Sequence, residues 1–152
     1  MEQLTIIQNS VRIGSLQHII PIVIAIIITI WSINYSSNKL NKAQQQKFIH
    51  FFACFISLCV ICFHLYRICF DGYNFKTDLP LYLCSLMTLL IPILTYYRKY
   101  WMFEVLVFLI IGGTLQAVIT PDITTGFPSF DYFRYWIAHL GLLIIIFYFI
   151  FV

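Results

Sequence analysis

Apolar residues along this chain gather into five long runs, separated by short segments rich in lysine, aspartate, glycine and proline. A helix that crosses a hydrocarbon core of about 30 Å needs about 20 residues. Each run must be helical if it lies in lipid, because an open strand would leave backbone groups unpaired there. The pattern therefore predicts an all-α transmembrane bundle, one domain over residues 1–152, with about five spans: Ser15–Ile33, Phe48–Phe70, Leu79–Tyr97, Trp101–Thr120 and Tyr132–Val152.

The segments between these runs carry turn and cap signals. Asn34–Lys47 is polar and lysine-rich and is predicted to be a loop, and Asp71–Asn74 has the composition of a turn. Pro121–Pro128 is predicted to be a structured loop that ends near Asp131, a candidate cap for the last helix. We find no internal repeat and no low-complexity tract.

Charge in these segments predicts the orientation of the bundle. The first loop holds three lysines and no acid, and the third holds Arg98 and Lys99. The second and fourth loops are slightly acidic, so positive loops alternate with negative ones along the chain. Since positive loops stay in the cytoplasm, we expect the N-terminus outside and a multi-pass protein of the cell membrane.

Composition supports lipid as the surroundings. Apolar residues make up 61% of the chain and charged residues only 10%, whereas soluble domains carry about 25% charged residues. The net charge of +3 comes from lysines that topology explains, so nucleic-acid binding is unsupported and membrane lipid is the expected partner. No pair of His, Asp or Glu has ligand spacing on one helix, so we predict no metal site and no cofactor.

The chain has five cysteines, at positions 54, 59, 62, 69 and 84. Four of them fall in one apolar run, which argues against structural disulfides. Cys59 and Cys62 have C-x-x-C spacing without the βαβ context of a redox motif. We therefore interpret Cys54, Cys59, Cys62 and Cys69 as packing residues.

Polar residues inside the spans are costly and are the place to look for function. Because the spans run alternately up and down, one such residue from every helix is expected in the outer third of the bilayer, beneath the loop Thr120–Pro128. These residues are His18, His64, Cys84, Gln116 and His139. We expect all five to face the bundle interior. Each also has a simpler explanation, because a polar side chain in a membrane helix often only joins two helices.

The most capable chemistry in this set is a thiol beside a base. Cys84 follows the first turn of its helix and is the candidate nucleophile, with His139 as the candidate base. Gln116 or backbone N–H groups of Thr120–Asp122 are candidate donors to an oxyanion. His18, His64, Gln116 and Asp122 are the candidate substrate-binding residues.

Several motifs resemble one family. Leu79–Leu86 (LPLYLCSL) is similar to the "LPLHLC" helix start of the YwaF-like integral membrane proteins of bacteria, and the order and spacing continue through Gly113–Ala117, Thr120–Asp122, Gly126–Pro128 and Ala138–His139. Gln17-His18 also fits. Tyr82 stands where the family often has histidine, and family members usually run to six or seven spans.

The resemblance implies an activity only through distant eukaryotic relatives, which look like membrane enzymes acting on lipid acyl chains. Carried over, Cys84 matches their nucleophile and His139 their histidine. The chain is then a cysteine-dependent acyltransferase or hydrolase acting on membrane phospholipid. Two alternatives stay open: a transporter of a small solute or protons, and a non-enzymatic assembly subunit. The absence of a repeat and the off-centre polar residues count against transport.

Overall fold

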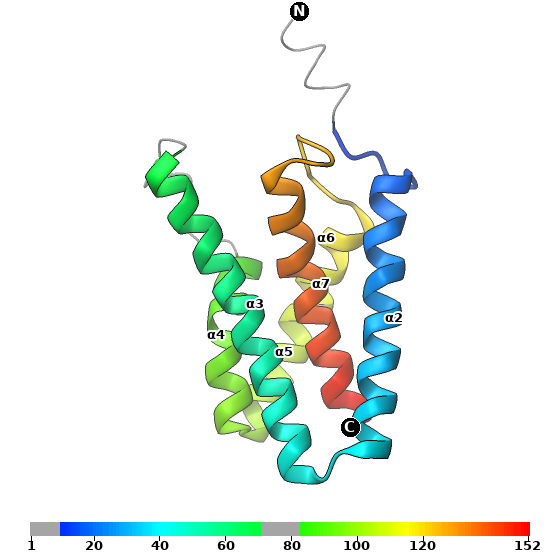
Figure 1. Cartoon of the computed structure of the whole chain (residues 1–152), viewed down its shortest axis with the longest axis vertical. Helices are drawn as coiled ribbons and strands as arrows, with labels where there is room; N and C mark the ends of the chain where they lie inside the picture. Colours follow the sequence, from blue (N-terminus) through cyan, green and yellow to red (C-terminus); the bar gives the residue numbers. More distant parts are fainter. Residues whose placement is uncertain (1–9, 71–82) are drawn as a thin grey trace, which may run out of the picture.

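The computed structural model describes residues 10–70 and 83–152, and every regular element in these ranges is a helix. The helices run alternately up and down, with α5, η1 and α6 forming one continuous stretch (Figure 1). They are α2 (Leu16–Lys39), α3 (Lys42–Phe70), α4 (Leu83–Tyr97), α5 (Tyr100–Leu109), the π-helical turn η1 (Ile110–Thr114), α6 (Leu115–Ile119) and α7 (Phe130–Phe151). The predicted all-α architecture is confirmed.

Four helices are long and apolar enough to cross a membrane: α2, α3, the continuous stretch Tyr100–Ile119 and α7. The third predicted span, Leu79–Tyr97, appears as the shorter α4, of 15 residues. Its predicted start at Leu79 and the predicted turn Asp71–Asn74 lie outside the described residues. Its end at Tyr97 agrees with the prediction.

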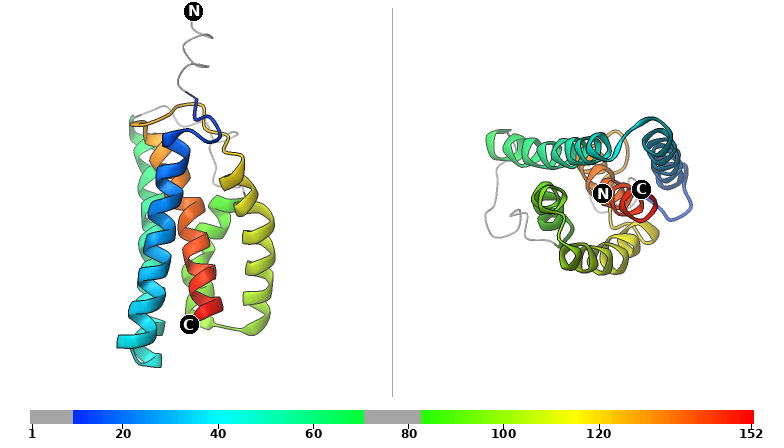
Figure 2. Two further views of the ribbon diagram at one scale, coloured as in Figure 1. Left: turned by 90° about the vertical axis from the view of Figure 1, so that its right-hand side faces the viewer. Right: turned by 90° about the horizontal axis from the view of Figure 1, so that it is seen from below.

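The bundle has two distinct ends (Figure 2). We call the end formed by residues 10–15 and the loop 120–129 the loop end. The opposite end carries the α2–α3 turn and the α4–α5 turn, with Lys39, Lys42, Arg98 and Lys99, and we call it the basic end. Both lysine- or arginine-bearing turns thus lie on one side, as the charge alternation requires. The direction of the bundle across the membrane stays a prediction.

The predicted loop Asn34–Lys47 is wrong, because only Leu40 and Asn41 lie outside helix. Asn41 and Gln44 form a capping box, in which each backbone N–H donates to the other residue's side-chain oxygen, at 3.0 and 2.9 Å. Lysine and glutamine are good helix formers. The helices therefore continue beyond the apolar runs from which the spans were predicted.

The fourth span is a composite of α5, η1 and α6. Its bounds, Tyr100–Ile119, lie within one residue of the predicted Trp101–Thr120, but the π-turn at Gly112-Gly113 was not predicted. A side-chain carbon at Gly113 would lie 3.4 Å from Leu83, whereas one at Gly112 would meet nothing. Gly113 thus sits where this span approaches the start of α4.

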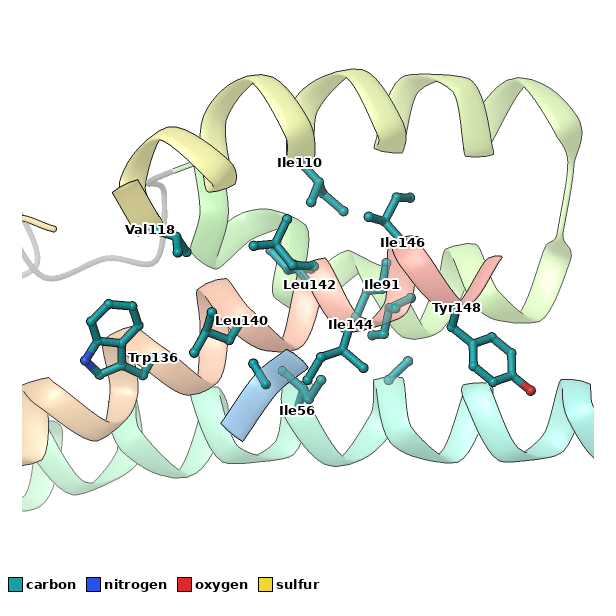
Figure 3. Close-up of a cluster of buried hydrophobic side chains, with 14 of the residues drawn as sticks. Ile56, Ile91, Ile110, Val118, Trp136, Leu140, Leu142, Ile144, Ile146 and Tyr148 are labelled. Atoms are coloured by element: carbon teal, nitrogen blue, oxygen red, sulfur yellow. The ribbon is translucent and has the colours of Figure 1, made fainter. Parts of the chain in front are cut away.

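Helix α7 is the central element of the bundle (Figure 3). It packs against α2, α3, α4, η1 and α6, and 56% of its apolar stretch is buried, against 17% for α2. A methyl group at Gly141 would lie 2.5 Å from Cδ1 of Ile56, so only glycine permits this closeness of α3 and α7. The helix begins at Phe130, two residues before the predicted Tyr132, and its cap is Ser129, which accepts from Tyr132 N–H at 3.2 Å. Asp131, the predicted cap, instead pairs with Arg134 at 3.4 Å.

Candidate functional site

Cys84 lies in the first turn of α4 and faces the π-turn of the fourth span. Its Sγ is 3.6 Å from Oγ1 of Thr114, and either group can donate the hydrogen. Thr114 is almost completely buried, and Cys84 is half-buried. π-Turns inside α-helices often mark functional sites because they redirect side chains. Here the turn carries Thr114 at its end and Gly113 against Leu83, so the local backbone brings a hydroxyl to the thiol.

His139 lies one turn after Tyr135 on α7, and the two rings stack with centroids 4.1 Å apart. The Nδ1 of His139 lies 2.7 Å from the carbonyl oxygen of Tyr135. A carbonyl oxygen can only accept, so Nδ1 carries the proton and Nε2 keeps a lone pair. In the neutral form of His139 the proton thus lies on Nδ1, and the basic nitrogen Nε2 points away from its own helix backbone.

Tyr135 links α7 to α6. Its hydroxyl donates to the carbonyl of Ala117 at 2.7 Å. In the described part of the chain no hydrogen bond joins Cys84 to His139. Cys84 contacts Thr114, and His139 stacks on Tyr135.

Neither Thr114 nor Tyr135 was singled out from the sequence. A signal for Tyr135 exists, because Tyr135 and His139 are spaced i, i+4 on a predicted helix and must share a face. Thr114 follows two glycines in a span, which indicates close approach but gives no partner. The α4–η1 contact arises only from tertiary packing.

His18 is buried and already uses both ring nitrogens. Nδ1 accepts from the backbone N–H of Gly14 at 3.0 Å, so Nε2 carries the proton and donates to the carbonyl of Val118 at 2.8 Å. The ring also lies against Trp136, with centroids 5.8 Å apart. His18 faces inward, as predicted, and it joins α2 to α6 in the manner of a structural residue.

The other candidates are less enclosed than we expected. Gln116 is exposed, and its amide donates to Thr120 on its own helix at 3.2 Å, so the prediction that it faces inward is wrong. It stands on the outer side of α6 because the inward side is taken by Val118. Asp122 is exposed in the loop, and His64 is half-buried on α3.

Two neighbouring cavities lie on the other side of α7. An apolar groove of about 610 Å³ runs between α2, α3 and α7, and its walls include Ile20, Ile24, Phe55, Trp136, Leu140 and Ile144. A second cavity of about 870 Å³ at the loop end is lined by Arg12, three serines and the loop residues Thr125–Ser129. The two share Leu16, Gln17 and Phe127, so a polar chamber with one cationic side chain opens beside an apolar groove.

A direct thiol–histidine contact lies toward the basic end. Cys54 Sγ is 3.7 Å from His50 Nε2, and His50 Nδ1 is 3.0 Å from Thr95 Oγ1. The interpretation of Cys54 as a packing residue therefore misses a polar contact, although its spacing from His50 (i, i+4) is visible in the sequence. Both residues lie within the predicted span Phe48–Phe70, but His50 was not among the polar residues singled out in the spans.

Among residues 10–70 and 83–152, no group of three His, Cys, Asp or Glu side chains is placed to hold a metal ion. All five cysteines are free thiols.

No curated protein and no solved structure matches the chain. The model of the TMEM164 family matches residues 13–152, a range that includes all the described helices. The motifs that resemble the YwaF-like bacterial proteins lie within this range, and that narrower resemblance stays a prediction. Because the match covers nearly the whole chain, this membrane protein belongs to the TMEM164 family.

Proposed function

We propose that this protein is a multi-pass enzyme of the cell membrane that transfers or hydrolyses an acyl group of a phospholipid, with Cys84 as nucleophile and His139 as base. The observation that carries the proposal is that the Cys84–Thr114 contact and the Tyr135–His139 stack lie on α4, η1 and α7, which pack against one another. Thiol, base and hydroxyl are the groups that acyl transfer needs.

Each group has a role in the reaction. His139 Nε2, directly or through one water, takes the proton of Cys84, and the thiolate attacks the ester carbonyl. Thr114, next to the thiol, is the nearest side-chain donor to the oxyanion that develops, a role that exposed Gln116 fits less well. The leaving lysophospholipid oxygen takes the proton from His139. The acyl thioester on Cys84 is then released to water or to a second lipid.

The cavities on the other side of α7 suit a phospholipid. The guanidinium of Arg12 complements a phosphate, and the apolar groove below it has the polarity of an acyl chain. Trp136 lines the groove and lies on α7 between Tyr135 and His139 in sequence, less than one turn from each.

The test uses purified protein in phospholipid vesicles, with fatty acid and acyl-exchange products measured by mass spectrometry. Activity should be abolished in Cys84→Ala and fall by about 10²-fold or more in His139→Gln. Cys59→Ala, on α3, is the matched control and should retain full activity. Equal activity of wild type and Cys84→Ala would overturn the assignment.

Orientation is tested separately. Lys99 at the basic end and Thr124 at the loop end are exposed, so each is replaced by cysteine in a cysteine-free background. An impermeant thiol reagent applied to intact cells should label position 124 and not position 99, because basic turns stay in the cytoplasm. The reverse pattern would invert the bundle.

A second candidate function, a non-catalytic assembly subunit, is favoured by the exposure of α2. Only 17% of its apolar stretch is buried, so most of this helix is offered to lipid or to another membrane protein. His18 and Tyr132 act only as links between segments. This role would be favoured if the purified protein is inactive on phospholipid and if detergent extraction yields it in a stoichiometric complex with another membrane protein.

A further inference from the structure

We propose that Cys54 is a second acyl-accepting thiol: it takes a fatty acyl group from the thioester of a phosphate-bearing carrier at the basic end of the bundle. This site is independent of the chemistry proposed for Cys84. On α4, Cys84 and Thr95 are eleven residues apart, or about 16 Å along the helix. A directed chain of hydrogen bonds and the charged residues around it define the site.

The direction of that chain follows from Thr95. Its hydroxyl has a single hydrogen, which it donates to the carbonyl of Pro92 at 2.9 Å. Thr95 Oγ1 must therefore accept from His50 Nδ1–H, at 3.0 Å. The other nitrogen, Nε2, then has a lone pair and accepts from the thiol of Cys54, at 3.7 Å. All protons in the chain point the same way, from thiol to imidazole to hydroxyl to carbonyl.

This arrangement has the three parts of an activated nucleophile: a thiol, a base within reach, and a third group that orients the base. Thr95 is completely buried, so its position is fixed by packing between α3 and α4. The Tyr96 ring covers His50 from another direction, with centroids 5.8 Å apart. Cys54 itself is only partly buried, so a substrate can approach it.

The surroundings define the class of substrate. Lys47 lies one turn before His50 on α3, and Arg98 and Lys99 follow Thr95 in the α4–α5 turn, all three exposed. These cations would attract a carrier that bears phosphates. Cys54 lies about one turn deeper than His50, or about 6 Å, among apolar side chains such as Phe51 and Phe55. A thioester with its acyl chain in the membrane and its anionic carrier at the surface meets both conditions.

The reaction balances without a further reagent. His50 Nε2 takes the thiol proton, and Cys54 Sγ attacks the thioester carbonyl. A new carbon–sulfur bond forms to Cys54, the bond to the carrier sulfur breaks, and His50 returns the proton to the departing thiolate. The products are S-acylated Cys54 and the free carrier thiol.

The experiment incubates the purified full chain in detergent micelles with palmitoyl-coenzyme A and measures hydroxylamine-sensitive acylation of each cysteine by peptide mass spectrometry. Wild type and Cys84→Ala should be acylated at Cys54, and Cys54→Ser should lose the label. His50→Gln should slow it at least about tenfold. Cys59→Ser, on the same helix, is the control that should not change the rate.

Two further variants separate chemistry from structural damage. Thr95→Val removes the hydroxyl at constant shape and should slow acylation, whereas Thr95→Ser should restore it, with thermal stability measured for both. Combined Lys47→Gln and Arg98→Gln should raise the half-saturating concentration of palmitoyl-coenzyme A but not that of uncharged S-palmitoyl-N-acetylcysteamine. Equal labelling of Cys54, Cys59 and Cys62, unaffected by His50→Gln, would overturn the proposal and leave that for Cys84 untouched.

Discussion

The two thiol–histidine sites of this protein are built in opposite ways. Cys54 and His50 lie one turn apart on α3, in direct contact, and need only Thr95 from a second helix. Cys84 and His139 lie 55 residues apart on different helices. Cys84 contacts Thr114 of η1 and His139 stacks on Tyr135 of its own helix, with no hydrogen bond between the two pairs in the described part of the chain. The first site depends on helix periodicity, and the second on how three segments pack. Changes in packing should therefore affect them unequally.

The largest expected effect is on the reactivity of each thiol when its histidine is replaced. His139→Gln should slow alkylation of Cys84 by iodoacetamide at least about tenfold and leave Cys54 unchanged, and His50→Gln should do the reverse, because a positioned base generates the thiolate. Rates are measured per cysteine by mass spectrometry. Cys59 and Cys62, which have no histidine contact among the described residues, should react slowly throughout. If replacement of one histidine slows alkylation of both Cys54 and Cys84, the two sites are not independent.

The next effect concerns packing. Gly113→Leu should force α4 away from η1, because its side chain meets Leu83, and should lower the free energy of unfolding by about 1–3 kcal/mol. The matched control is Gly112→Leu, since nothing lies within 4 Å of a side chain there. Thermal unfolding in detergent and per-cysteine alkylation are the measurements. Gly113→Leu should change the reactivity of Cys84 and not that of Cys54. A similar loss in the two variants would mean that the glycines serve helix geometry alone.

The smallest effect is the loss of one hydroxyl. Tyr135→Phe removes the hydrogen bond to Ala117 and should lower the free energy of unfolding by about 0.6 kcal/mol. If this hydrogen bond positions the site, the same energy corresponds to about a threefold change in the reactivity of Cys84. Tyr148→Phe is the comparison at the basic end, where the hydroxyl donates to Ser36 at 2.9 Å. Tyr148→Phe should lower the free energy of unfolding by a similar amount and leave the reactivity of Cys84 unchanged. No difference in Cys84 reactivity between the two variants would argue against a role for Tyr135 in the site.

Much of the fold follows from hydropathy alone. The fourth and last spans were placed to within two residues, because lipid demands long apolar helices whatever their partners are. The predicted loop Asn34–Lys47 failed for a local reason, since Asn41 and Gln44 cap a helix made of polar residues. His50 already lay in the predicted span Phe48–Phe70 beside Cys54, so helix periodicity alone would have placed the two on one face.

The sequence by itself determined that this chain is a membrane-spanning helical protein, which residues are out of place in lipid, and which pairs share a helix face. It did not determine which helix is central. α2 is more apolar than α7, with a mean hydropathy of 2.2 against 1.8, yet α7 is the buried one. Lipid and protein interior are about equally apolar, so hydropathy does not separate them. Only tertiary packing decided that α3 approaches α7 closely at Gly141, that Thr114 contacts Cys84, and that Gln116 faces outward.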